Sequence, residues 1–118
     1  MRKTYVVSAK RSAIGSFLGS LTTVKPVDLG ATVVKALLED GKVAPEQVDE
    51  LLCGNVLSAG LGQNIGRQVA LAAGIPESVC SHSVNMVCGS GLRTVMEGVM
   101  SIQTGFNDIV VAGGVESM

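Results

Sequence analysis

The chain has 118 residues, enough for one domain of ordinary size. It is 47% hydrophobic and 16% charged, a balance that excludes a disordered or highly solvated polypeptide. Nine basic and ten acidic residues are scattered without a basic stripe and give a net charge of -1, so nucleic acid is not expected as a partner.

The first half of the chain alternates between strand and helix patterns. The apolar run "TYVVSA" predicts a strand over residues 4–9, and a loop punctuated by glycine and serine follows it. A helix is predicted over 26–40, because Pro26 suits a first helical position and the apolar residues recur at helical spacing. The next apolar run predicts a strand over 48–57.

The second half repeats this alternation. Asn64 can cap a helix predicted over 64–73, and a strand is predicted over 81–87. A third helix is expected from Cys88 or Gly89 to Thr104, and a last strand over 108–115.

This order of elements predicts an α/β fold. Alternating strands and helices imply right-handed crossovers and a mostly parallel sheet. The strands are continuous apolar runs, so helices should cover both faces of the sheet.

The third helix has two different faces. We expect its large apolar residues to pack on the chain's own sheet: Leu92, Val95, Met96, Val99 and Ile102. The opposite face is small and weakly polar, which suits close approach by another helix: Gly91, Thr94, Gly98, Ser101 and Gly105. Such a face, together with an open edge on the last strand, favours association over a stable monomer.

The three cysteines, Cys53, Cys80 and Cys88, lie far apart and form no CxxC pair. This spacing argues against a metal site and a disulfide scaffold, and it suits a reducing compartment. No apolar run approaches the ~18 residues that a membrane span needs, and the charged start is followed by too short an apolar run for a signal peptide. We therefore expect a cytoplasmic protein without a membrane partner.

Cys88 is the candidate nucleophile. It lies where a parallel strand ends, which is where ligands bind in such sheets, and at the start of a helix, where unpaired N–H groups favour negative charge. A thiolate is the nucleophilic form of cysteine. Gly89 and Gly91 leave the approach to the sulfur open, and Ser90 adds a hydroxyl in the same turn.

The residues around Cys88 resemble the first signature of the thiolase family, the acetyl-CoA acetyltransferases. The fit covers Val84, Asn85, Cys88, Gly89, Ser90 and Gly91, and it continues into the helix at Leu92, Thr94, Val95 and Ile102. The segments "GLGQNIGRQVALAAGIP" and "VAGGVESM" are also similar to thiolase segments. In the early loop, Ser12-Ala13 stands where the family often has Thr-Pro.

The resemblance implies that Cys88 becomes acylated by an acyl-CoA thioester and that a second acetyl-CoA then forms a 3-ketoacyl-CoA, or the reverse. It implies CoA thioesters as substrates, no separate cofactor, no metal, and a homo-oligomer. Gly89, Ser90 and Gly91 would line the approach to the thiol.

The resemblance also predicts which parts of a thiolase are missing. Residues 1–118 would be an incomplete N-terminal domain of an αβαβα fold, with the loop domain and the C-terminal half absent. The family's catalytic histidine, in a Gly-His-Pro segment, and its second cysteine, in a Cys-x-Gly segment, are not found here. The one histidine, His82, matches neither segment, so we expect a structural role for it and an inactive fragment.

Two alternatives remain open. The chain could be a non-catalytic truncated product or one chain of a split thiolase. It could also be a condensing enzyme similar to 3-ketoacyl-ACP synthases, although these usually read Ala-Cys-Ser-Ser where this chain has Val87-Cys88-Gly89-Ser90.

Overall fold

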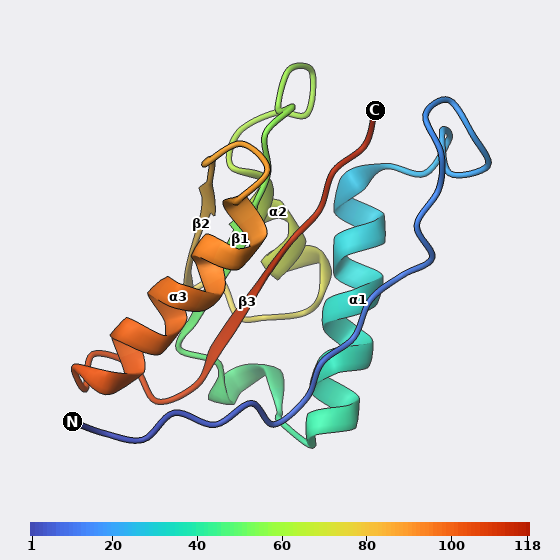
Figure 1. The fold of residues 1–118 in the computed structure, drawn as a ribbon. Coiled ribbons are helices and arrows are strands. Elements are labelled where there is room, and N and C mark those ends of the chain that lie inside the picture. Colours follow the sequence, from blue (N-terminus) through green and yellow to red (C-terminus); the bar gives the residue numbers. More distant parts are fainter.

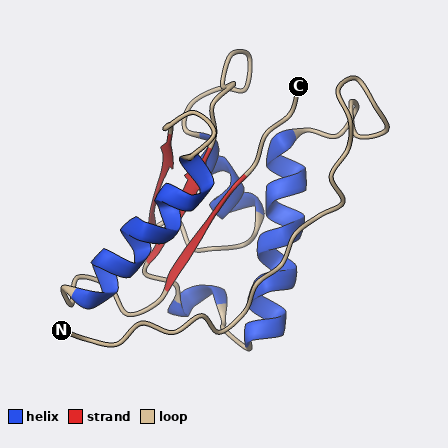
Figure 2. Ribbon diagram, in the orientation of Figure 1, coloured by secondary structure: helices blue, strands red, loops and turns tan.

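The computed structural model describes residues 1–118 and contains a three-stranded parallel sheet with helices on both faces (Figures 1 and 2). Its elements follow in this order: α1 (Pro26–Gly41), the 3₁₀ turn η1 (Pro45–Gln47), β1 (Glu50–Gly54), α2 (Ile65–Ala72), β2 (Cys80–Val84), α3 (Ser90–Gln103) and β3 (Val110–Gly114). The predicted α/β class and parallel sheet are confirmed. None of the α-helices is long and apolar enough to cross a bilayer.

β1 is the central strand, in the order β2-β1-β3. Gly54 at the end of β1 is in register with Val84 and Gly114, so all three strands end at the same edge of the sheet. Cys88 and Glu116 lie in the segments that leave the sheet at this carboxyl edge, after β2 and β3.

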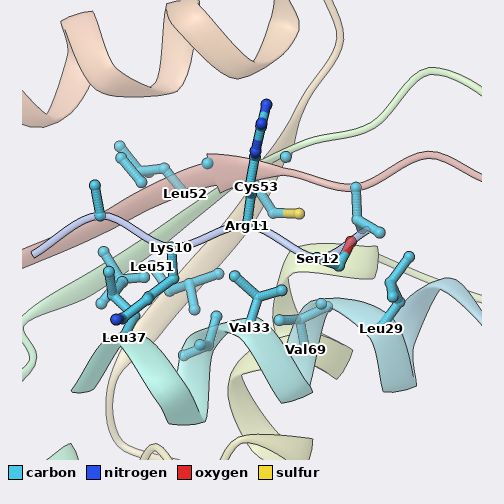
Figure 3. Close-up of a pocket in the computed structure, with 18 of the residues that line it drawn as sticks. Lys10, Arg11, Ser12, Leu29, Val33, Leu37, Leu51, Leu52, Cys53 and Val69 are labelled. Carbon is cyan, nitrogen blue, oxygen red and sulfur yellow. The ribbon is translucent and has the colours of Figure 1, made fainter. Parts of the chain in front are cut away.

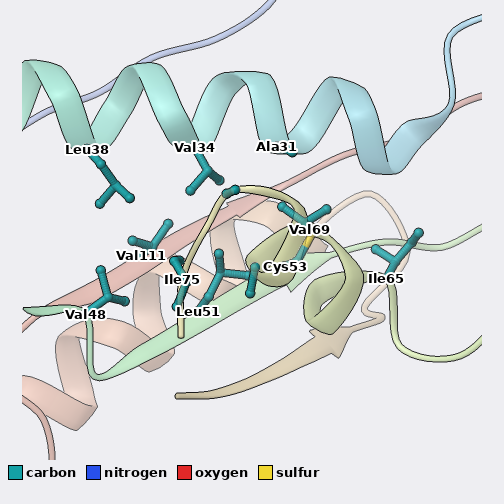
Figure 4. Close-up of a cluster of buried hydrophobic side chains, with 12 residues drawn as sticks. Ala31, Val34, Leu38, Val48, Leu51, Cys53, Ile65, Val69, Ile75 and Val111 are labelled. Atoms are coloured by element: carbon teal, nitrogen blue, oxygen red, sulfur yellow. The ribbon is translucent and has the colours of Figure 1, made fainter. Parts of the chain in front are cut away.

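The hydrophobic core lies between the sheet, α1 and α2 (Figure 4). Leu51, Cys53 and Val111 point from the sheet toward Val34 of α1 and Val69 of α2. Full burial of one such side chain contributes about 1.5–3 kcal/mol. The helical predictions for α1 and α2 are confirmed, including the cap on α2, where Asn64 accepts a hydrogen bond from the Arg67 amide at 3.2 Å.

α3 covers the opposite face of the sheet, with its small residues inward. Thr94 is fully buried and its hydroxyl donates to Gly91 O at 2.6 Å and lies 3.0 Å from Gly113 O. A Cβ on Gly98 would lie 3.2 Å from Val110 of β3. Large residues of the other face are exposed, among them Leu92 at 69%. The prediction that the large apolar face packs on the sheet was wrong, because only small residues allow the helix to approach the strands this closely.

The predicted strand over residues 4–9 was also wrong: the segment is extended but pairs with no strand. It runs beside α1 in Figure 1, where Ser8 donates to Asp40 at 2.7 Å and Lys10 pairs with Asp40 at 3.1 Å. The Ser8 hydrogen bond, with help from Lys10, lowers the pKa of Asp40. Tyr5 and Val6 are mostly exposed. The segment has the composition of a strand, but no neighbouring strand pairs with it.

Candidate functional site

Cys88 lies in a tight turn that joins β2 to α3. The strand ends at Val84 and the helix begins at Ser90, with Gly89 as its N-cap residue, so Cys88 precedes the helix rather than forming its first turn. The Cys88 side chain is exposed. No side chain caps α3, and the first amide of the helix, that of Ser90, donates to Val87 O at 3.2 Å.

The residue before Cys88 has an unusual backbone conformation. Val87 has a φ of 50°, in the left-handed region. A β-branched residue is a genuine outlier there, and such residues cluster at active sites, where the surrounding structure holds them in place. The turn therefore resembles the strained strand-to-helix turns that present nucleophiles in other folds.

Ser90 holds this turn from inside. The residue is only 4% exposed, and its Oγ accepts a hydrogen bond from the Met86 amide at 2.8 Å. The same hydroxyl donates to Val87 O at 2.6 Å. Asn85 contributes from the other side, since its Oδ1 accepts from the Val87 amide at 3.1 Å. The sequence pattern selected Ser90 as a neighbour of the thiol, but its two hydrogen bonds could not be foreseen.

The glycines of the turn have different surroundings. A Cβ on Gly91 would meet nothing within 4 Å, so space is open there. A Cβ on Gly89 would lie 3.2 Å from Met86. On Gly54, at the end of β1, it would lie 2.7 Å from the Gly91 nitrogen and from the Ser90 carbonyl carbon. Gly54 therefore lets the start of α3 rest directly on the central strand.

Glu116 fixes a second loop at the same edge of the sheet. Its carboxylate accepts from the amides of Val56 at 2.9 Å and Leu57 at 3.1 Å, and from Asn55 Nδ2 at 3.4 Å. Glu116 therefore holds together the segments that follow β1 and β3.

The other two cysteines have different environments, and none of the three is in a disulfide. Cys53 is part of the core, and burial raises the pKa of its thiol to about 11. Cys80 is exposed at the start of the edge strand β2. The structure has no cluster of three or more side chains suited to a metal ion.

His82 lies on β2 between two carboxylates. Its Nδ1 is 3.5 Å from Glu50 Oε1 and its Nε2 is 3.9 Å from Glu97 Oε2. Glu97 also accepts from Arg93 Nε at 2.7 Å. This position agrees with a structural role for the histidine.

A large groove lies away from Cys88, between β3, α1 and the N-terminal segment (Figure 3). Its volume is about 710 Å³, and its lining is mostly hydrophobic and includes Leu29, Val33 and Val69. Arg11 and Ser12 of the N-terminal segment border it. Cys88 is not part of this lining.

The chain is similar to thiolases along its whole length. A sequence model described as "Thiolase, N-terminal domain" matches residues 4–118. The acetyl-CoA acetyltransferase of Escherichia coli (strain K12) is 52% identical over 118 residues, which are 100% of this chain and 30% of that protein. The cytosolic acetyl-CoA acetyltransferase of Rattus norvegicus is 53% identical over 113 residues, 96% of this chain and 28% of that protein.

A solved structure has the same fold. The crystal structure of the Acat5 thiolase from Ascaris suum in complex with coenzyme A superposes with a TM-score of 0.91 at 43% identity. The match covers 93% of this chain and 29% of that one. The chain thus spans about 30% of the length of the relatives it matches.

Proposed function

Because the chain belongs to the thiolase family, we propose that it supplies the nucleophile of an acyl-CoA acyltransferase and that Cys88 is this nucleophile. The observation that carries the proposal is the exposed Cys88 in a strained turn at the carboxyl edge of a parallel sheet. Ligands of parallel α/β sheets bind at this edge. Open space at Gly91 supports a substrate that approaches the sulfur from that side.

The proposed reaction has two stages. The Cys88 thiolate attacks the carbonyl carbon of an acyl-CoA thioester, a C–S bond to the enzyme forms, and the bond to CoA breaks with loss of the CoA thiolate. Acetyl-CoA that has lost a proton from its methyl carbon then attacks the acyl-enzyme. This step forms a carbon–carbon bond, releases the Cys88 thiolate and gives a 3-ketoacyl-CoA. Thiolysis of 3-ketoacyl-CoA by CoA is the reverse.

Acetyl-CoA or other acyl-CoA thioesters are the proposed substrates, and the proposal includes no separate cofactor and no metal. The relatives carry the name acetyl-CoA acetyltransferase, and the Ascaris suum thiolase was solved with coenzyme A. We place the protein in the cytoplasm. Gly89 and Gly91 are proposed to border the bound thioester, whereas Ser90 is buried beneath the turn.

Residues 1–118 alone are proposed to be inactive. Their one histidine lies between Glu50 and Glu97, so it is not available as the base that activates Cys88. When catalytic residues act as a unit, loss of one costs several orders of magnitude in rate. Thiolysis of acetoacetyl-CoA at an ordinary enzymatic rate by this 118-residue chain would contradict this part of the proposal.

We also propose that the protein is an oligomer. Leu92, Met96 and Met100 on the outer face of α3 are 46–69% exposed, and both β2 and β3 have an open edge. Apolar surface and unpaired edges of this kind favour association with a second copy or with further protein.

The test of the proposed function uses the native protein, purified at the length that its own gene encodes. We expect it to cleave acetoacetyl-CoA in the presence of CoA, and we expect Cys88→Ser to abolish this activity while Cys80→Ser retains it. Full activity in Cys88→Ser would overturn the assignment of the nucleophile.

A further inference from the structure

We propose that Ser90 is a positioning residue for the acyl-transfer reaction: its buried hydroxyl holds Val87 in the left-handed conformation and so fixes the orientation of Cys88. This inference rests on the proposed function only for its kinetic consequence. Its structural part concerns the turn alone.

The left-handed conformation of Val87 needs support from its surroundings. The left-handed conformation costs free energy for an L-residue with a Cβ, and a β-branched residue is a particular outlier there. Packing of the side chain does not offset this cost, because Val87 is 66% exposed. The support must therefore come from hydrogen bonds to the backbone of the turn.

Ser90 provides hydrogen bonds on both sides of Val87. Its Oγ accepts from the Met86 amide at 2.8 Å and donates to Val87 O at 2.6 Å. The Val87 carbonyl belongs to the peptide group whose nitrogen is that of Cys88. A hydroxyl bound to this carbonyl therefore fixes the peptide plane from which the nucleophile extends.

Ser90 is itself held firmly in place. It is the first residue of α3 and is only 4% exposed. A Cβ built on Gly54 would lie only 2.7 Å from the Ser90 carbonyl carbon. The hydroxyl is thus anchored to the central strand through close backbone packing. A small side chain with one donor and one acceptor fits both of its partners at once.

Two substitutions should have opposite effects on the turn. One removes the Ser90 hydroxyl, and the other removes the conformational cost of a positive φ at Val87. In Ser90→Ala the turn loses both hydrogen bonds, and we expect the left-handed population of Val87 and the rate of acyl transfer to Cys88 to fall about tenfold. Val87→Gly removes the cost, because glycine accepts positive φ freely. The double variant Ser90→Ala/Val87→Gly should therefore recover most of the lost rate.

The experiment measures the first-order rate of acetyl transfer from acetyl-CoA to Cys88 in the native protein, by quenching and peptide mapping. We expect the loss to appear in the rate at saturation and not in the concentration of acetyl-CoA that gives half saturation. Thr104→Val is the matched control, because it removes another hydroxyl of α3, one that donates to Met100 O and Ser101 O at the end of the helix opposite the turn. It should leave the transfer rate unchanged.

Crystal structures of the variants separate this inference from the proposed function. If Cys88 is never acetylated but φ of Val87 leaves the left-handed region in Ser90→Ala, the proposed function fails and the structural inference stands. If Ser90→Ala does not fold, Val87→Gly alone still tests the inference, and its melting temperature should not be lower than that of the unmodified protein. An unchanged rate and an unchanged φ in Ser90→Ala, or a double variant no faster than Ser90→Ala, would overturn it.

Discussion

Gly54 tests whether the start of α3 rests directly on the central strand. In Gly54→Ala, the new Cβ would lie 2.7 Å from both the Gly91 nitrogen and the Ser90 carbonyl carbon. Both are backbone atoms, so the helix itself must shift. Overpacking costs about 1–3 kcal/mol, and the gain from replacing glycine in a strand returns about 0.5–1 kcal/mol. We expect Gly54→Ala to lower the free energy of unfolding by about 1–2 kcal/mol, measured by urea denaturation.

Gly91→Ala is the matched control for this prediction. Its Cβ meets nothing within 4 Å, and alanine is favoured over glycine inside a helix by about 0.5–1 kcal/mol. The two substitutions add the same methyl group on opposite sides of one contact and should change stability in opposite directions. Equal stability of Gly54→Ala and the unmodified protein would refute the close packing of α3 on β1.

Three further predictions concern the cysteines and the exposed helix face. Limited iodoacetamide labelling should modify Cys88 first and Cys53 last, and faster labelling of Cys80 than of Cys88 would count against the reactive turn. Since the pKa of Cys53 is about 11 in the fold and 9.0 ordinarily, the contribution of this thiol to stability should be constant below pH 9 and fall between these two values. A pH titration of urea midpoints should show this fall, and Cys53→Ala should weaken it. Sedimentation should show that the 118-residue chain associates at micromolar concentration, and that Met96→Glu associates less. A stable monomer would contradict the inference that the exposed apolar face of α3 favours association.

The sequence was sufficient for the parts of the fold that depend on local pattern. Pro26 at the start of α1 and Asn64 at the cap of α2 fulfil their predicted roles. The change from strand to helix around Cys88 was also foreseen, although the helix begins at Ser90.

Hydrophobic pattern alone was insufficient where a partner decides the outcome. The segment over residues 4–9 has strand composition but no strand beside it. In α3 the large residues were assigned to the sheet, yet Thr94 and Gly98 make that contact because the helix lies close to β3. The pattern shows which faces differ, but the distance between layers decides which of them is buried.

The geometry of the turn could not be predicted from residue types. A valine gives no signal for positive φ, so the conformation of Val87 was not expected. The signature placed Ser90 beside Cys88, but its burial and its two hydrogen bonds depend on how α3 packs on Gly54.

The most direct test of the central claim is to identify which cysteine becomes acetylated. The native protein is incubated with acetyl-CoA, quenched in acid, and mapped by peptide mass spectrometry. We predict one acetyl group on the peptide that contains Cys88 and none on that peptide in Cys88→Ala. Acetylation confined to other cysteines, or an unmodified Cys88 in a protein that turns over acetoacetyl-CoA, would contradict the account.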